Sequence, residues 1–335
     1  MTAELELEYV LPLRWSDDAG LDDLTDYLRA IGRLADTTVV DGSAEPLFRE
    51  HAARWAGTVR HLRPEPWPGR NGKVAGVMTG LRHARHDRVV IADDDVRYDE
   101  SGLRRIAEAL TTADVVRPQN YFSALPWHAR WDTARTLVNR AVSSDYPGTL
   151  GVHRDLVLAA GGYAGDVLFE NLELIRTVRQ AGGSELKADD LFVARVPPTT
   201  SQFWGQRIRQ AYDSFAQPER LMAELAILPA IGWSLRHRPW LLALAAASVA
   251  LAEAGRRRAG AAAVFPGTAA LWAPVWVAER GVCAWLAVGM RMRGGVPYRG
   301  SRLLHSVSTV ADRRSRAAVP VSPSEPTARG RARDD

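Results

Sequence analysis

Three consecutive aspartates, Asp93, Asp94 and Asp95, directly follow the apolar run 89–92. Adjacent carboxylates repel one another, and one turn-forming residue is enough to end a strand. Side chains alternate along an extended chain, so Asp93 and Asp95 share a face. Two carboxylates on one face at the end of a strand suit a divalent cation, Mg²⁺ or Mn²⁺, that takes phosphate oxygens as further ligands. The structural alternative is a solvated acidic turn after a buried strand.

The first 220 residues alternate strand and helix patterns, which must position these carboxylates. Strands separated by helices of this length predict parallel βαβ units and an α/β, doubly wound, mostly parallel sheet. In such a sheet ligands bind beyond the carboxyl ends of the strands. Asp41 and Asp93 both follow strand patterns at this edge, so we expect them to line one crevice. The predicted strands are 6–13, 37–43, 58–64, 88–92 and 113–119, and the predicted helices are 17–34, 47–57, 73–85 and 101–113.

The composition becomes apolar after about residue 220. Residues 239–252 and 259–278 carry no charge, and 281–290 form a third apolar stretch. A run of roughly twenty apolar residues can span a bilayer, and flanking arginines and tryptophans suit lipid headgroups. We therefore expect 1–220 to be a catalytic domain and 221–295 a membrane-associated region of apolar helices, with the number of spans open. The alternative for this region is an Ala-rich soluble helical subdomain. The Arg-, Pro- and Ser-rich remainder, 296–335, is predicted to be a disordered tail.

Charge and cysteine content narrow the class further. The formal net charge is +4, and Cys283 is the single cysteine, so no intramolecular disulfide can form. The first ten residues are acidic and lack the basic and apolar regions of a signal peptide, which predicts a cytoplasmic catalytic domain. The arginines are dispersed or lie beside the apolar stretches and do not interleave with aromatic residues, so no nucleic-acid partner is expected.

Five short motifs resemble those of the family 2 glycosyltransferases, which have the GT-A fold, and they occur in the family's order between about residues 5 and 215. They are VVDGS (39–43), NGKVAGVMTGL (71–81), VVIADDDV (89–96), GGY (161–163) followed by FENLELIRTVRQAGG (169–183), and QRIRQ (206–210).

The resemblance implies a site for a nucleotide-sugar donor. It places Asp41 at the nucleotide base, Lys73 near the donor, Asp93 and Asp94 at the donor, and Asp95 with Asp93 at the metal. It also implies that QRIRQ supplies donors to the diphosphate from Gln206, Arg207 and Arg209, of which Arg209 matches the family's arginine better. A guanidinium fork suits a diphosphate, and a divalent cation would neutralise the charge that grows on the leaving nucleotide.

The catalytic base departs from the family pattern. Inverting members carry a base where this chain has Asn171, and an amide cannot accept the proton. The remaining carboxylates are Glu170, which we favour, and Glu173. They lie three residues apart on one face of a helix, so spacing does not separate them. The alternative for both is a capping or salt-bridging role.

The acceptor side also departs from the pattern. Gln210 replaces the family's tryptophan, a position that Trp204 or Tyr212 could fill instead. Trp127 and Trp131 lie in a segment where an acceptor would bind in this fold, or else they pack between domains.

The sequence thus predicts a metal-dependent, membrane-associated glycosyltransferase that moves a sugar from a UDP- or GDP-sugar to a lipid-linked or cell-envelope glycan acceptor. The resemblance implies an inverting reaction. Two other hypotheses follow from the departures: a retaining transferase of the same fold, and a catalytically silent membrane scaffold that binds sugar nucleotides.

Overall fold

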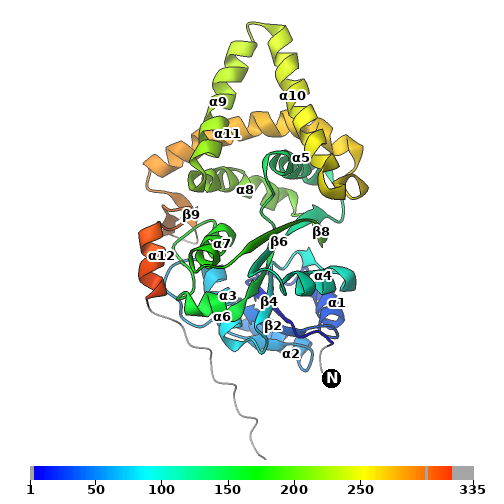
Figure 1. The fold of residues 1–335 in the computed structure, drawn as a ribbon, viewed down its shortest axis with the longest axis vertical. Coiled ribbons are helices and arrows are strands. Elements are labelled where there is room, and N and C mark those ends of the chain that lie inside the picture. The colour runs from blue at the N-terminus through cyan, green and yellow to red at the C-terminus, as the bar shows by residue number, and fades with distance from the viewer. Residues whose placement is uncertain (1–3, 299–300, 319–335) are drawn as a thin grey trace, which may run out of the picture.

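The computed structural model describes residues 4–298 and 301–318, and its centre is an eight-stranded sheet (Figure 1). The strand order is β3-β2-β1-β4-β7-β6-β8-β5. Strands β3, β2, β1 and β4 run parallel, as do β6 and β8, whereas β7 is antiparallel to both of its neighbours. The strands are β1 (Glu8–Leu13), β2 (Asp36–Asp41), β3 (Arg60–Leu62), β4 (Arg88–Ala92), β5 (Val96–Arg97), β6 (Val115–Phe122), β7 (Thr149–His153) and β8 (Glu185–Arg195).

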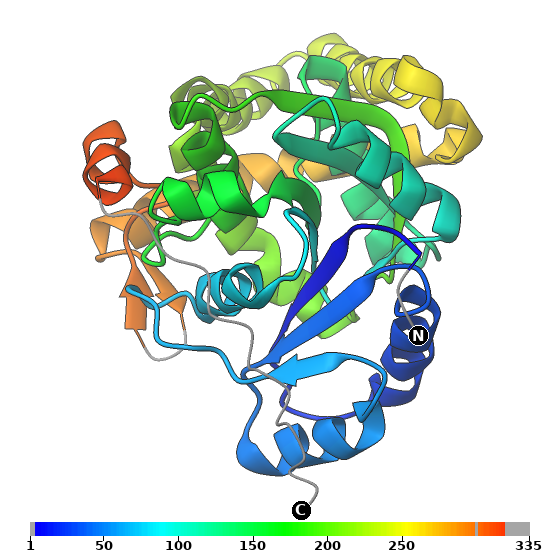
Figure 2. The same cartoon turned by 60° about the horizontal axis from the view of Figure 1, so that its bottom comes forward.

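Helices cover both faces of the sheet because side chains alternate along each strand. In β1, Tyr9 and Leu11 pack with helices α1 and α4, whereas Val10 packs on the other face with α3 and α7. Figure 2 shows α1 and α3 on opposite sides of the first strands. The helices are α1 (Leu21–Ile31), α2 (Glu45–Trp55), α3 (Gly72–His83), α4 (Glu100–Ala109), α6 (Arg154–Ala159) and α7 (Glu170–Gln180).

The predicted mostly parallel, doubly wound sheet is confirmed. The predicted strand 88–92 coincides with β4, and the other predicted strands overlap β1, β2, β3 and β6. The sequence did not reveal β5, which has two residues, or the antiparallel β7. Such short strands owe their conformation to pairing with distant partners, and local pattern carries little of that information.

Helix α5 and residues 200–292 form a helical layer above the sheet's edge (Figure 1). Helices α5 and α10 pack against each other, and α8 and α9 each pack against α11. The layer comprises α5 (Trp127–Val142), α8 (Thr200–Tyr212), α9 (Pro218–Ser234), α10 (Arg238–Arg257), the short 3₁₀ turns η1 (Asp213–Ala216), η2 (Arg258–Ala263) and η3 (Gly267–Trp272), and α11 (Ala273–Met292).

The expectation of bilayer-spanning apolar helices is wrong for this layer. Within the part of the chain that the structure describes, each helix is too short or too polar to cross a membrane. The uncharged stretch 259–278 is not one helix, because the backbone turns at Ala259 and Gly260, with φ of 51° and 73°, and again at Pro266. Its buried alanines instead pack against α5 and α10. The apolar run therefore builds a protein core.

The region predicted as a tail begins with regular structure. Residues 296–318 include a hairpin, β9 (Val296–Tyr298) and β10 (Ser301–Leu303), and helix α12 (Val310–Ala317). Helix α12 contacts α7 through Arg313, which lies 3.3 Å from Glu173. The tail prediction for 319–335 falls outside the described residues.

Candidate active site

The acidic triplet leaves β4 with its side chains in two directions. Asp93 and Asp95 both face Arg195 at the end of β8: the Arg195 Nε donates to Asp95 Oδ2 at 2.6 Å, and a guanidinium nitrogen lies 4.0 Å from Asp93. Asp94 turns elsewhere and accepts a hydrogen bond from the Trp15 indole. The shared face predicted for Asp93 and Asp95 is therefore present.

One oxygen of this pair has no protein partner. Asp95 Oδ1 is buried without a hydrogen bond from the described residues. Burial raises the pKa of Asp95, the Arg195 charge opposes that rise, and the neighbouring Asp93 and Asp94 carboxylates add to it. A bound cation would reduce the repulsion between the carboxylates and would give Asp95 Oδ1 the partner that it lacks. The pair therefore fits a divalent ion.

Lys73 connects the triplet to helix α7. The lysine stands in the first turn of α3, where Asn71 caps the helix by accepting from the Lys73 backbone N–H at 3.1 Å. Its Nζ lies 2.6 Å from Asp93 and 2.7 Å from Glu170. Burial alone would lower the pKa of Lys73, but the two carboxylates outweigh it and raise the pKa above its usual value. Lys73 is therefore a fixed positive charge between two predicted site residues.

These groups lie where two parts of one cleft join. The wide part has a volume of about 850 Å³ and the narrow part about 300 Å³. The narrow part is formed at the carboxyl ends of β1 and β2, with Leu13, Val40 and Gly42 in its wall. Six residues line both parts: Arg14, Lys73, Asp93, Asp94, Glu170 and Arg209.

The two candidate bases have different surroundings. Glu170, in the first turn of α7, lines both parts of the cleft. Glu173 is fully buried and lines neither part; it accepts hydrogen bonds from Ser308, Arg313 and Arg316. The Asn171 amide lines the wide part and donates to the Pro147 carbonyl at 2.9 Å. The geometry favours Glu170 as the group that meets substrate.

The three polar residues predicted from QRIRQ separate in the structure. Gln206 and Arg209 line the wide part of the cleft. Arg207 points into the protein, where it is 3% exposed and lies 2.8 Å from Asp132 and 3.7 Å from Glu279. Contacts of Arg207 with a donor stay a prediction, and its observed partners give it a structural role.

Two comparisons with known proteins agree with this geometry. The sequence model described as "Glycosyl transferase family 21" matches residues 41–119, the stretch that holds Asp41, Lys73 and the acidic triplet. The solved mannosyltransferase PcManGT from Pyrobaculum calidifontis, in complex with GDP-Man and Mn²⁺, has a TM-score of 0.51 and 20% identity over 84% of this chain and 87% of that chain. Together they support a family 2-like glycosyltransferase.

The match over residues 41–119 supports the predicted glycosyltransferase assignment, and the sheet matches a GT-A-like fold. At 20% identity the likeness to the mannosyltransferase shows a shared fold and nothing finer. A glucosyl-3-phosphoglycerate synthase from M. tuberculosis is also similar, at 18% identity over 59% of this chain and 74% of that chain, but its TM-score of 0.40 is too low to support an argument. No curated protein sequence matches this glycosyltransferase chain.

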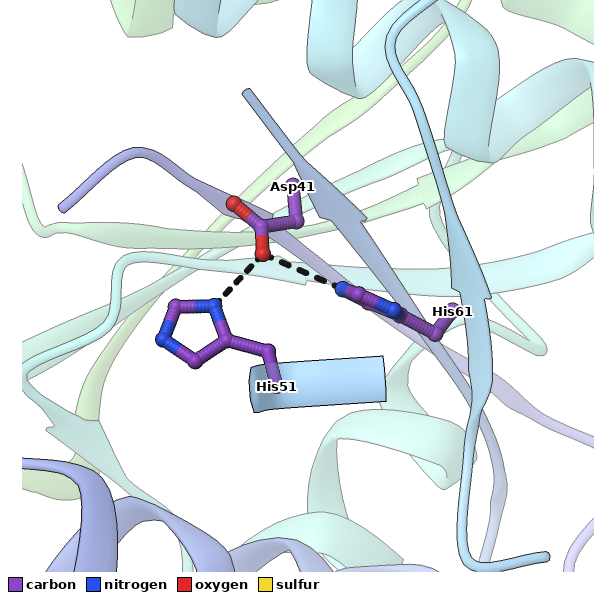
Figure 3. A group of neighbouring side chains, drawn as sticks. All are labelled: Asp41, His51 and His61. Atoms are coloured by element: carbon purple, nitrogen blue, oxygen red, sulfur yellow. Dashed lines mark hydrogen bonds and ion pairs between the residues drawn. The ribbon is translucent and has the colours of Figure 1, made fainter. Parts of the chain in front are cut away.

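Asp41 belongs to a buried cluster beside the narrow part (Figure 3). Its Oδ2 lies 2.6 Å from His51 Nδ1 and 3.1 Å from His61 Nε2, and its Oδ1 accepts from the Ser43 N–H at 2.8 Å. Burial would raise the pKa of Asp41, but hydrogen bonds from His61, Ser43 and His51 outweigh it and hold the pKa far below its usual range. Contact between Asp41 and a nucleotide base stays a prediction; its neighbours Val40 and Gly42 line the cleft.

The same cluster offers ligands to a metal ion. Asp41, His51 and His61 bring three ligand atoms within 4.8 Å of one another, and no other group of three does so among residues 4–298 and 301–318. The second ring nitrogen of His51, Nε2, lies 2.8 Å from Asp18. A carboxylate in this position commonly orients a histidine that binds a metal ion. None of the three lines the cleft. An ion here would fix the ends of β2 and β3 and would not touch a substrate in the cleft.

The predicted acceptor tryptophans gather in one aromatic cluster. Trp127, Trp131 and Trp204 surround Phe203, with ring centroids 5.1 to 5.7 Å from it. Trp127 is 42% exposed and Trp204 52% exposed, yet none of the three lines the cleft. Gln210 does line its wide part. Acceptor binding by these tryptophans stays a prediction. The contacts that they make in the structure are packing contacts, which agrees with the alternative.

The cleft residues that the sequence reasoning did not assign to the site include Arg195, Asp213 and Arg280. Arg195 is the last residue of β8, a strand that the sequence did not reveal, and it bonds Asp95 from 100 positions away. Burial raises the pKa of Asp213 to about 7, with Arg209 opposing the rise and Glu170 adding to it. Arg280 lies in the region 221–295, which was predicted to associate with a membrane. Only Asp213, four residues after Arg209, carried a usable signal, because that spacing keeps both on one helical face.

Proposed function

We propose that the chain transfers a sugar from a nucleotide diphosphate sugar, with the help of a divalent cation, onto an acceptor bound in the wide part of the cleft. The observation that carries this proposal is the meeting of Lys73, Asp93 and Glu170 where the two parts join. A donor with its nucleotide in the narrow part would place its diphosphate and sugar at this junction. The acceptor hydroxyl would then approach through the wide part.

Asp93 and Asp95 are the residues that would hold Mg²⁺ or Mn²⁺, and the unpartnered Asp95 oxygen supports this assignment. The bound ion would supply positive charge against the leaving diphosphate. The solved mannosyltransferase that shares the fold was obtained with GDP-Man and Mn²⁺, which is in keeping with the proposal. Arg209 lines both parts of the cleft and would act with the ion on the diphosphate.

Glu170 would act as the general base of an inverting reaction. A base must reach the acceptor hydroxyl, and Glu170 lines the junction while Lys73 fixes its position at 2.7 Å. If Glu170 instead only holds Lys73, a retaining transfer or a silent binding protein becomes the better description. The anomeric configuration of the product, read by NMR, separates inversion from retention.

The direct test is thermal denaturation with a panel of UDP- and GDP-sugars, each with and without Mn²⁺, followed by an assay of nucleotide release. A true donor binds the folded state and raises the melting temperature by mass action. We expect one donor to do so only with the metal present, and EDTA to abolish turnover. Turnover that survives thorough metal removal would contradict the role of Asp93 and Asp95.

We further propose that the enzyme works at a membrane surface on a lipid-linked or cell-envelope acceptor. Helices α9 and α10 form a hairpin that projects from the body (Figure 1). Near its tip Trp233, Trp240 and Leu242 are 51%, 58% and 72% exposed, beside the exposed Arg236 and Arg238. Amphipathic tryptophans with adjacent arginines suit the interface of an anionic bilayer. The cytoplasmic location predicted from the sequence remains part of this proposal.

Vesicle flotation tests the membrane contact. The wild-type chain is expected to float with phosphatidylglycerol vesicles and less with phosphatidylcholine vesicles. Replacing Trp233 and Trp240 together by serine should abolish flotation while leaving the melting temperature within a few degrees, because both side chains are half-exposed. As a control, serine at Trp204, which is 52% exposed on α8, should leave flotation unchanged. Equal flotation of the wild type and the double variant would exclude the hairpin as the contact.

A further inference from the structure

Arg280 is a fully buried arginine without a hydrogen-bond partner among the described residues. It lies in α11 and has 0% exposure, and its Nε and both terminal nitrogens lack acceptors. Its guanidinium carbon lies 5.5 Å from the centre of the Trp276 ring. A buried cation without hydrogen bonds is costly unless an anion compensates it.

Two other buried arginines have protein partners. Arg140 is also 0% exposed, but it donates to the Gln119 side chain and to the carbonyls of Asp189 and Arg258 at 2.8 to 3.0 Å. Arg207 forms an ion pair with Asp132 at 2.8 Å, although its two terminal nitrogens also lack hydrogen bonds among the described residues. Arg280 differs from both: among the described residues it has neither a hydrogen bond nor an ion pair, and it lines the wide part of the cleft. Its missing partner can therefore be a ligand.

The surroundings of Arg280 suit an anion. Arg135 and Arg220 line the same part of the cleft and repel the Arg280 charge, whereas the Glu224 and Glu279 carboxylates attract it. Glu224 is already engaged by the Arg220 Nε at 2.9 Å. Asp213 also lines this part, and because burial raises its pKa to about 7, its neutral form can donate a hydrogen bond to an anionic oxygen near neutral pH.

The position of Arg280 assigns the anion to the acceptor side. Arg280 lines the wide part but not the narrow part, and the shared residues Lys73, Asp93 and Glu170 lie between the two. Resting on the proposed function, we infer that the acceptor carries a phosphate group, which Arg280 binds at the end of the cleft away from the nucleotide. A guanidinium fork matches a phosphate in two parallel hydrogen bonds. The acceptor class is therefore a phosphorylated molecule, and the phosphate orients the hydroxyl that reacts.

Titration of the wild-type chain with inorganic phosphate is the first test. Phosphate should raise the melting temperature at constant ionic strength, relative to chloride. The rise should persist when UDP and GDP with Mn²⁺ are present at saturation, because acceptor phosphate and donor diphosphate would occupy different parts of the cleft. Loss of the phosphate effect under saturating nucleotide would show that Arg280 serves the donor, and no phosphate effect at all would overturn the site.

Arg280→Met, with Arg293→Met on the exposed end of α11 as the matched control, is the second test. Phosphate affinity should fall at least tenfold in Arg280→Met and stay within threefold in the control. Nucleotide affinity should stay within threefold in both. A tenfold loss of nucleotide affinity in Arg280→Met would contradict the acceptor assignment.

Arg280→Lys keeps a cation in the same place if the methionine variant does not fold. It should bind phosphate more weakly than the wild type, because it loses the fork, and unchanged phosphate affinity would count against the proposal. Failure of the glycosyltransferase proposal would look different: no nucleotide sugar would shift the melting temperature, while phosphate would still bind through Arg280.

Discussion

Exchanging Glu170 for glutamine tests the assignment of the base most sharply, because Glu173 offers a matched control three residues away. Glutamine keeps the shape of the side chain and an oxygen that can accept from Lys73, but it cannot accept a proton from the acceptor. Lys73 also retains its ion pair with Asp93 at 2.6 Å. The change in stability should therefore be small, about 1 kcal/mol. The change in turnover should be large.

General base catalysis typically contributes about 10²–10⁴-fold, which corresponds to roughly 3–5 kcal/mol of activation free energy. We therefore expect Glu170→Gln to lower kcat by at least about 100-fold while the melting temperature moves by only a few degrees. Donor affinity, measured by the melting-temperature shift with nucleotide sugar and Mn²⁺, should remain. Nucleotide release at saturating donor is the assay.

Glu173→Gln should show the opposite pattern. The Glu173 carboxylate has no exposure and neutralises Arg313 and Arg316 at 3.3 and 3.2 Å. Breaking a buried pair costs about 3–5 kcal/mol, and the partial exposure of Arg316 reduces that to about 3 kcal/mol. The melting temperature should fall by several degrees, with turnover per folded molecule nearly unchanged. If Glu170→Gln kept activity within a few-fold, or Glu173→Gln lost it while folded, the assignment would be refuted.

Two further predictions concern the metal and pH. Asp95→Asn should reduce the Mn²⁺ stimulation of turnover by at least about 100-fold, because it removes a charged oxygen ligand from the cleft. The control His61→Asn alters the buried cluster and should leave the response to Mn²⁺ intact. Equal responses in the two variants would argue against the metal site in the cleft. Asp213→Asn should change how stability depends on pH: the folded pKa of about 7 exceeds the unfolded value, so this carboxyl stabilises the fold fully below about pH 4, and that contribution is lost as pH rises through 7. Chemical denaturation at pH 5 and pH 8 should therefore show the variant gaining on the wild type by about 2.5 kcal/mol at the higher pH. A gap that does not grow would mean that the buried carboxyl is not protonated.

The sequence by itself determined the sheet and the junction of the cleft. The apolar run 89–92 and the carboxylates after it specify a strand end, because alternation and local repulsion are properties of neighbouring residues. The helix pattern from Lys73 placed that lysine in a first turn beside the same edge. Together with the motif order, this was enough to predict Asp93, Lys73 and Glu170 as members of one site.

Only the tertiary structure decided the remaining contacts. Hydropathy cannot tell a helix that faces lipid from one that faces protein, so the apolar stretches on either side of Arg280 were mistaken for membrane segments. Glu170 and Glu173 share a helical face, and what separates them is α12, 140 residues further along the chain, which supplies Arg313 to Glu173. Arg195 reaches Asp95 across 100 residues. Such pairings depend on which distant segments the fold brings together. The local sequence shows that a residue is charged, but it does not show which residue will be its partner.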